Sequence, residues 1–304
     1  MNISVVGSKG LAKELGKKGT SSDITLYNTS FQGNYYTFAE PEKYPEKIQT
    51  LFQSLNMSQF VILYITKELP KNILGECIIA LDLLKINGIL VLDGIEESEI
   101  KPFLKETFLE DFPIVENEKV LEFLSKNNIG APTNSEMGAK IKIQNSTPKV
   151  LIDHSFLVKS VGTVALGTVI SGTIKKYDKL SIYPSKKEIL IKSIQIHDKA
   201  FEEACPFERV GLCIKGAEAS ELKRGCIISN DIDCVKEISV SLVKNKFFNG
   251  EHGKFMCIAG LQYVPCKFED EKIIFENEIA FDGEPLILLT PEKKMRIFGV
   301  CEKK

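Results

Sequence analysis

This chain of 304 residues has eight cysteines and three histidines, residue types that can bind a metal or take part in catalysis. No two cysteines form a Cys-x-x-Cys pair and the histidines are scattered, so the spacing excludes a zinc site of the usual kind. The chain opens on a strand-like segment rather than a signal peptide, and no apolar run approaches the ~20 residues that cross a bilayer. We therefore expect a cytoplasmic protein whose reduced thiols pack as small apolar groups and hold no metal.

Lysines that could bind an anion fall into two runs. The first run could contact a phosphate at a helix N-terminus or could form a solvated helix face, and it comprises Lys9, Lys13, Lys17 and Lys18. The second could follow an RNA backbone or could form a solvated hairpin face, and it comprises Lys175, Lys176, Lys179, Lys186, Lys187 and Lys192, with Tyr177 and Tyr183 between them. The net charge of -2 gives no bulk electrostatic argument for nucleic acid, so any RNA contact must come from such local patches.

The first 129 residues alternate apolar runs with amphipathic stretches. The apolar runs predict strands at residues 3–6, 24–27, 35–38, 60–65, 89–92 and 113–115. Helical spacing predicts helices over residues 9–18, 46–55, 73–84, 98–108 and 119–126. This alternation is typical of a doubly wound, mostly parallel sheet that is covered on both faces.

The pattern changes after the turn-rich residues 130–135. From residue 140 onward the chain reads as short strands separated by Gly, Pro and Asp, with a further break near residues 230–233. We expect three domains, an α/β domain over 1–135 and two β-barrels over 140–232 and 233–304. Gly162, Gly167 and Gly172 recur every five residues, where a barrel strand must bend or another backbone approaches closely.

Residues 161–172 read Val-Gly-Thr-Val-x-x-Gly-Thr-Val-Ile-Ser-Gly, and further blocks follow at 194–198, 209–212 and 222–225. Their order and spacing resemble the second domain of elongation factor Tu and its relatives. The residues of these blocks are most similar to those of the selenocysteine-specific factor SelB, particularly its archaeal branch and the EF-Pyl-like proteins. Residues 295–299 resemble the last strand of the third domain in that branch. The resemblance implies a GTPase-like α/β domain followed by two barrels of the elongation factor Tu type.

This resemblance also implies a phosphate loop, Gly-x-x-x-x-Gly-Lys-[Ser/Thr], after the first strand. Residues 7–14 read Gly-Ser-Lys-Gly-Leu-Ala-Lys-Glu, in which Gly7 and Lys13 match the pattern. Ala12 replaces a glycine whose backbone conformation can be costly for alanine. Glu14 stands where the magnesium-binding hydroxyl belongs, and a carboxylate ~4 Å from a phosphate costs about 4 kcal/mol at an effective dielectric of ~20.

Two further nucleotide motifs depart from the family pattern. Residues 39–44, Ala-Glu-Pro-Glu-Lys-Tyr, stand where the γ-phosphate sensor Asp-x-x-Gly-His is expected. Residues 93–96, Asp-Gly-Ile-Glu, stand where Asn-Lys-x-Asp would read guanine. Three altered motifs predict a degenerate GTPase-like domain with no catalytic residue and with neither GTP nor magnesium as a cofactor. Gly7 and Lys13 would then be the remnant of a weak phosphate site.

For the barrels, the resemblance implies a cleft for the aminoacylated end of transfer RNA on the second domain and a contact with the acceptor arm on the third. It places Gln195, His197 and Arg209 near that cleft, and His197 could instead be an ordinary barrel-edge histidine. The candidate RNA-binding residues are therefore Gln195, His197, Arg209, Lys175, Lys176, Lys186 and Lys187.

Three functions follow from these patterns. The first is a monomeric SelB-like elongation-factor homologue that lacks GTP hydrolysis and binds transfer RNA, aminoacyl-tRNA or a ribosomal partner, but neither DNA nor a membrane. The second is an active, divergent GTPase elongation factor, which Gly7 and Lys13 favour. The third is a regulatory scaffold that kept the fold for protein–protein contact.

Overall fold

The computed structural model describes residues 1–127, 129, 146–196, 199–249 and 254–304. The predicted break at residues 130–135 and the candidate residue His197 lie outside this described part of the chain. The chain divides into two compact units. One comprises Met1–Ala131, Val243–Gly250 and Leu288–Val300, and the other comprises Pro132–Leu242, Glu251–Ile287 and Cys301–Lys304. The predicted domain boundaries stay predictions.

The α/β part is built on a six-stranded sheet in the order β2-β3-β4-β1-β5-β6. The strands are β1 (Asn2–Gly7), β2 (Lys17–Ser21), β3 (Thr25–Phe31), β4 (Asn34–Glu40), β5 (Phe60–Thr66) and β6 (Gly88–Asp93). Strands β4, β1, β5 and β6 run parallel, whereas β2 and β3 are antiparallel additions at one edge. Because β1 and β5 are paired on both sides and covered on both faces, they are almost entirely buried.

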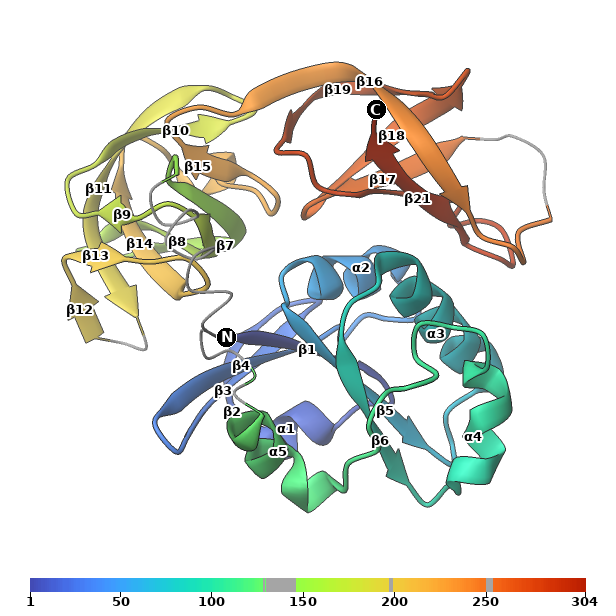
Figure 1. Cartoon of the computed structure of the whole chain (residues 1–304). Coiled ribbons are helices and arrows are strands. Elements are labelled where there is room, and N and C mark those ends of the chain that lie inside the picture. Colours follow the sequence, from blue (N-terminus) through green and yellow to red (C-terminus); the bar gives the residue numbers. More distant parts are fainter. Residues whose placement is uncertain (128, 130–145, 197–198, 250–253) are drawn as a thin grey trace. The chain divides into compact units, whose positions relative to one another are not determined.

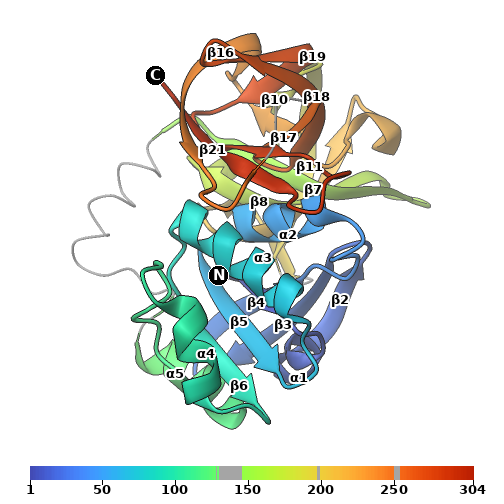
Figure 2. The same ribbon diagram turned by 90° about the vertical axis from the view of Figure 1, so that its right-hand side faces the viewer.

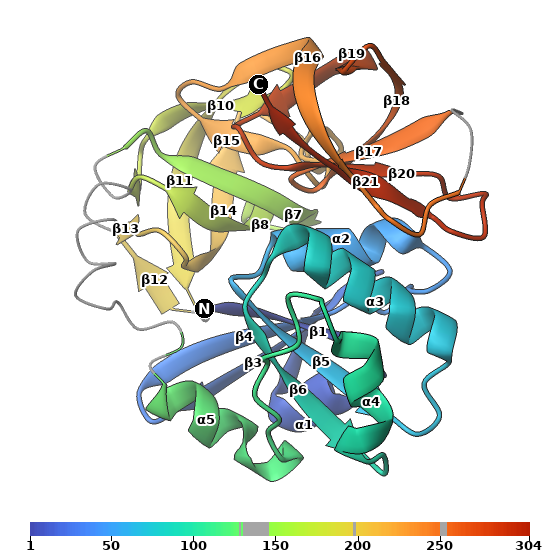
Figure 3. The same ribbon diagram turned by 45° about the vertical axis from the view of Figure 1, so that its right-hand side comes forward.

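Helices cover both faces of this sheet (Figure 3). They are α1 (Leu11–Leu15), α2 (Ile48–Asn56), α3 (Lys71–Leu84), α4 (Glu97–Leu104) and α5 (Val120–Lys126), with a 3₁₀ turn at Asn117–Lys119. Helices α1 and α5 bury their apolar side chains in one core with Val5, Ile62 and Val91. Helix α2 lies on the opposite face, where Ser54 hydrogen-bonds Ser4 of β1 at 3.0 Å. The predicted doubly wound α/β sheet is confirmed.

The first predicted helix is much shorter than residues 9–18. Helix α1 ends at Leu15 because Gly16 adopts an extended conformation, with φ -155° and ψ 168°. Lys17 and Lys18 therefore lie on strand β2, opposite Asn28 and Tyr27 of β3. The interpretation of these two lysines as part of a helix face was wrong, because the exposed edge strand has too few apolar residues to show strand alternation.

The first β-barrel follows. Its strands are β7 (Lys149–Val158), β8 (Gly162–Ser171), β9 (Ile174–Lys175), β10 (Lys179–Tyr183), β11 (Lys187–Ile196), β12 (Lys199–Phe201), β13 (Glu203–Ala204), β14 (Arg209–Lys215) and β15 (Ile227–Ser229). Pairing of β10 with β11 closes six of these strands into a ring, and β9 pairs with β13 in a separate two-stranded sheet (Figure 1). Alternate side chains such as Ile182, Ile191 and Leu212 fill the interior.

The second β-barrel is a closed ring in the order β16-β19-β18-β17-β20-β21, which Figure 2 shows. Its strands are β16 (Asp233–Lys244), β17 (Phe255–Ala259), β18 (Gln262–Glu269), β19 (Lys272–Phe281), β20 (Leu286–Leu289) and β21 (Ile297–Lys303). The fold class predicted from the sequence, an α/β domain followed by two β-barrels, is therefore confirmed. The eight cysteines are all free thiols. No helix in the described part of the chain has the length and apolar character needed to span a membrane.

One predicted glycine position illustrates why the first barrel has its sequence pattern. A Cβ atom at Gly167 would lie 2.4 Å from the carbonyl oxygen of Leu151 on the paired strand β7. This distance is far inside van der Waals contact, so the strands pair in this register only with glycine here. The register breaks between Ile152 and His154, where a bulge bends β7.

Candidate functional site

The segment after β1 is the first part of the candidate site, because ligands in open α/β sheets bind at the carboxyl ends of the parallel strands. Gly7 has a φ of +97°, and a Cβ atom at this position would lie 2.3 Å from the carbonyl oxygen of Tyr64. The amide of Ser8 donates to this carbonyl at 2.8 Å, which holds the segment tightly against β5. Gly7 is therefore required for packing in this structure, whether or not a phosphate binds.

Glu40, the last residue of β4, lies at the start of α1. Its side chain is only 3% exposed, and the amide of Gly10 donates to its Oε2 at 3.0 Å. The amide of Ala12 lies close enough to this carboxylate to act toward a lower pKa. Backbone amides that point outward at the beginning of a helix are the groups with which a phosphate loop binds its ligand. In this chain an internal carboxylate takes one of those amides, that of Gly10.

The electrostatics of this position disfavour further negative charge. Burial raises the pKa of the Glu40 carboxyl group, and Glu42 raises it too, although the two amides and Lys9 act in the opposite direction. The net effect is a raised pKa, so the loop does not fully offset the cost of burying even one carboxylate. Lys9 points its Nζ at the carbonyl oxygen of Glu42, 2.6 Å away. Further negative charge beside Glu40 would add to the cost of burying its carboxylate.

The remaining loop positions contribute no magnesium ligand of the family kind. Lys13 and Glu14 are both exposed on the short helix α1. Glu14 accepts a hydrogen bond from Nδ2 of Asn117 at 2.7 Å, so it points toward the turn before α5. The loop is therefore filled by Glu40 rather than by Glu14, the residue that stands out in the sequence pattern.

Asp93 ends β6, where the guanine-reading motif would begin. The hydroxyl group of Tyr64 donates to Oδ2 of Asp93 at 2.9 Å. Burial, followed by this hydrogen bond, raises the pKa of Tyr64 to about 12, so the phenol stays protonated and keeps donating. Nearby, the hydroxyl groups of Ser8 and Thr66 hydrogen-bond one another at 3.0 Å. Polar groups at this edge of the sheet thus satisfy one another instead of facing a purine ring.

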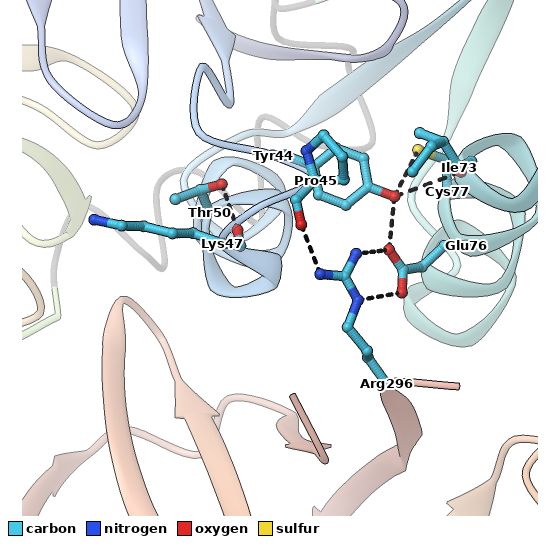
Figure 4. A network of polar contacts seen from close by, with 8 residues as sticks. All are labelled: Tyr44, Pro45, Lys47, Thr50, Ile73, Glu76, Cys77 and Arg296. Atoms are coloured by element: carbon cyan, nitrogen blue, oxygen red, sulfur yellow. Dashed lines mark hydrogen bonds and ion pairs between the residues drawn. The ribbon is translucent and has the colours of Figure 1, made fainter. Parts of the chain in front are cut away.

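A buried polar network follows directly along the chain from Glu40 (Figure 4). The hydroxyl group of Tyr44 donates to Glu76 of α3 at 2.8 Å and lies 3.8 Å from the thiol of Cys77. Arg296 forms a two-pronged ion pair with Glu76, with Nε at 2.9 Å from Oε1 and with Nη2 on Oε2. Its Nη1 also donates to the carbonyl oxygen of Pro45 at 2.6 Å.

This network holds a segment that the resemblance links to the γ-phosphate sensor. Arg296 and Glu76 have side-chain exposures of 17% and 9%, so water screens their ion pair only weakly. Arg296 belongs to Leu288–Val300, which is part of the same compact unit as the α/β sheet. Residues 41–47 are thus held at one end by Glu40 and further along by Tyr44 and Pro45. Sequence reasoning missed this network, because no local motif marks Glu76 as the partner of Arg296.

On the first barrel, Arg209 is engaged by an acidic neighbour. Its guanidinium group forms a two-pronged ion pair with Asp153, with one N–O distance of 3.0 Å. The two side chains are 11% and 7% exposed. Arg224 Nε donates to the backbone carbonyl of the same Asp153 at 3.2 Å. Two of the five N–H donors of Arg209 are therefore bonded to Asp153.

The candidate lysines lie in two separate places. Lys175 and Lys176 lie at and just after β9, within 3.7 Å of Glu203 and 3.1 Å of Glu202 respectively. Lys186 and Lys187 lie at the β10–β11 turn, where Lys187 pairs with Glu221 at 2.6 Å. These pairs neutralise much of the positive charge that the sequence run displays.

Gln195 is exposed on β11, opposite Ala200 of β12 and Gly211 of β14. Gly211 leaves space beside it, because a Cβ atom there would come no closer than 3.4 Å to another residue. Phe201 of β12, whose side chain is exposed, lies directly opposite Ile194 of β11. Gln195 and Phe201 therefore lie on opposite faces of the hairpin of β11 and β12, since neighbouring residues of a strand point to opposite sides. The candidate residue His197 lies outside the described residues.

Comparison with known proteins identifies relatives of the chain. Residues 162–229 match the family described as Elongation factor Tu domain 2. An uncharacterized protein of Methanocaldococcus jannaschii is 38% identical over 96% of this chain and 95% of its own length. The selenocysteine-specific elongation factor of the same organism is 30% identical over 91% of this chain, which spans 62% of that relative.

The fold has a close counterpart among solved structures. Translation elongation factor SelB of Methanococcus maripaludis, in complex with the GTP analogue GppNHp, superimposes with a TM-score of 0.80 at 19% sequence identity. The match covers 100% of this chain and 78% of that protein. At this identity the likeness concerns the fold.

Removing Arg296 tests the buried network. Arg296→Met should lower the free energy of unfolding by about 3–5 kcal/mol, because Glu76 would stay buried without its partner. The matched control is Lys272→Met, whose pair with Glu237 is half exposed on both sides and should contribute at most about 1 kcal/mol. Urea denaturation of both variants measures the loss in the free energy of unfolding. Equal losses would contradict the proposed contribution of the network to stability.

Glu40 should give the protein a specific pH dependence. Its pKa is raised above the ordinary 4.5 in the folded state, so the folded state keeps this proton to higher pH than the unfolded state. The contribution of Glu40 to stability therefore falls as pH rises above 4.5 and levels off beyond the folded-state pKa, with a slope of at most about 1.4 kcal/mol per pH unit. The measurement is the difference in unfolding free energy between the natural chain and the Glu40→Gln variant over a range of pH. A difference that does not change with pH would refute this prediction.

Proposed function

Because this chain belongs to the SelB-like family of translational GTPases, we propose that it is an elongation-factor homologue that binds transfer RNA or another partner of the translation apparatus without a GTP cycle. The observation that carries this proposal is the buried Glu40 carboxylate, which accepts a hydrogen bond from the amide of Gly10 at the start of α1. We place the protein in the cytoplasm and expect it to act as a monomer.

Three features of the α/β part support the absence of a GTP cycle. The Gly10 amide, a donor that a phosphate would need, is already bonded to a buried carboxylate. Asp93, an acidic residue at the end of β6 where the guanine-reading motif would begin, accepts a hydrogen bond from Tyr64. Residues 41–47, which would have to respond to a γ-phosphate, are tied to Glu76 and Arg296. In each case, a group that would contact GTP in an active GTPase contacts another residue of the chain instead.

Two features of the first barrel support RNA binding. The family match covers residues 162–229, which contain β11, β12 and β14. On these strands Gln195 and Phe201 are exposed on opposite faces of the hairpin, so the amide could hydrogen-bond a base edge on one face and the ring could stack on a different base on the other. We propose that this hairpin contacts the terminal nucleotides of transfer RNA, and His197 remains a candidate in this proposal.

The other candidates have different roles in this proposal. Arg209 orders the barrel through Asp153 rather than contacting RNA directly. Lys175, Lys176 and Lys187 belong to a solvated face that their glutamate partners keep nearly neutral. We still propose an RNA contact for Lys186, which lies at the turn between β10 and β11.

The test is binding of labelled transfer RNA, aminoacylated and uncharged, by fluorescence anisotropy with and without GTP and magnesium. We expect salt-dependent binding at micromolar protein that GTP does not change, because the phosphate loop is filled. Gln195→Ala should weaken binding, whereas Gln49→Ala on helix α2 should not. Absence of salt-dependent binding would overturn the proposal, and an affinity that rises with GTP would favour an active GTPase instead.

A further inference from the structure

The loop that follows β16 is built more rigidly than an ordinary surface loop. Nδ2 of Asn245, a buried side chain, donates to the carbonyl oxygen of Ile297 at 2.9 Å. The amide of Asn245 donates to the carbonyl of Phe298 at 2.9 Å, and its Oδ1 accepts from the amide of Phe247 at 3.0 Å. One asparagine therefore fixes the loop to β21 and sets the direction of the two phenylalanines that follow.

Those two phenylalanines point to different environments. Phe248 is 4% exposed and packs edge-to-face on Phe298, with ring centroids 5.0 Å apart. Phe247 is 55% exposed, although its backbone amide is fixed by Asn245. Phe247 is therefore an exposed aromatic ring whose backbone is fixed, which leaves the face of the ring accessible to a partner.

Lysines surround these rings. Lys244 lies 5.9 Å from the ring of Phe248, and Lys293 lies 5.4 Å from the same ring. Lys246 lies 5.2 Å from the exposed ring of Phe247. Contacts of this kind hold the ammonium groups over the rings, and for Lys244 and Lys246 they leave hydrogen-bond donors available. Within the residues that the structure describes, neither Lys244 nor Lys246 forms an ion pair with a carboxylate.

The carboxylate of Asp82 on α3 interacts electrostatically with Lys246. Asp82 has a lowered pKa, for which its hydrogen bonds from Lys85 and from the amide of Phe108 outweigh burial, and Lys246 adds a smaller effect. Lys85 Nζ and the Phe108 amide each lie 2.8 Å from Oδ1 of Asp82. Asp82 therefore offsets part of the charge of Lys246 without forming an ion pair with it.

A similar pair on the first barrel shows what is distinctive here. Lys176 lies 5.1 Å from the exposed ring of Tyr177, which repeats the geometry of Lys246 and Phe247. Lys176, however, forms an ion pair with Glu202 at 3.1 Å. The same lysine–aromatic arrangement is thus neutralised at one place in the chain and left charged at the other.

We propose that Lys244, Lys246, Phe247 and Lys293, here named the loop patch, form a contact surface for RNA. The lysines would bind backbone phosphates, and Phe247 would stack on an unpaired base. Charge complementarity favours this partner, because lysines with one exposed ring match phosphates with one base. A protein partner is less well matched, since lysine is depleted in the cores of protein interfaces and the patch has little apolar area.

This inference does not depend on the proposed function, because the loop patch is separate in sequence and fold from the β11–β12 hairpin. It concerns any RNA with an accessible base, whether or not transfer RNA binds at Gln195. The two ideas fail separately: Gln195→Ala addresses transfer RNA at the hairpin, and substitutions of the loop patch address single-stranded RNA.

The experiment measures binding of fluorescein-labelled single-stranded polyuridylate to the full chain over a series of salt concentrations. The double variant Lys244→Gln/Lys246→Gln should reduce the salt-dependence slope by about 1.4, since each phosphate contact on a single strand contributes about 0.7. Phe247→Ala should weaken binding by at least about fivefold with the slope unchanged, because stacking is not ionic. The matched controls are Lys175→Gln/Lys176→Gln and Tyr177→Ala, which should have little effect.

Several outcomes would overturn the proposal. Equal losses in the loop-patch variants and in their matched controls would show only a general charge effect. An unchanged affinity in Phe247→Ala would remove the stacking contact. Equal binding of polyglutamate would indicate an acidic protein partner, and binding of anionic lipid vesicles in preference to RNA would indicate a membrane surface. Lys244 packs on Phe248, so its substitution could also affect folding. The second variant is therefore Lys246→Gln alone. It should leave the thermal unfolding curve unchanged and show half of the change in the salt-dependence slope.

Discussion

The hydrogen bond from the amide of Gly10 to the Glu40 carboxylate is the constraint on which the α/β part depends. It occupies a backbone donor of the loop that follows β1, and it joins the end of β4 to the beginning of α1. The acceptor is a buried side chain of the protein itself. Under the proposed function, this internal acceptor stands where a nucleotide phosphate would otherwise bind.

The effect of Glu40 extends along the chain, because residues 41–47 follow it directly. Tyr44 and Pro45 are bound to Glu76 and Arg296, so this segment has a second set of internal partners. Burial raises the pKa of Cys77 to about 12, which keeps its thiol neutral beside Tyr44. In a nucleotide-driven switch such a segment needs two arrangements of similar free energy. Here its contacts favour one arrangement.

Sequence patterns predicted the fold class but only part of the candidate site. Buried strands such as β5 and glycines such as Gly167 leave local signals, since burial and close backbone approach restrict residue types. Glu40 was noted only as a departure from a motif, because its hydrogen bonds to Gly10 join residues far apart in sequence. Arg209 and Lys176 look available for RNA in the sequence, and only the fold brings Asp153 and Glu202 beside them. The basic-aromatic residues 244–248 did carry a readable signal, in the form of lysines interleaved with phenylalanines.

The most direct test of the central claim is residue-resolved amide hydrogen exchange of the loop that follows β1. If Glu40 is the permanent ligand of this loop, the Gly10 amide exchanges slowly without nucleotide, and saturating GTP with magnesium leaves its rate unchanged. Fast exchange of Gly10 that becomes slow on addition of GTP would contradict the account, because it would show an open loop that nucleotide closes.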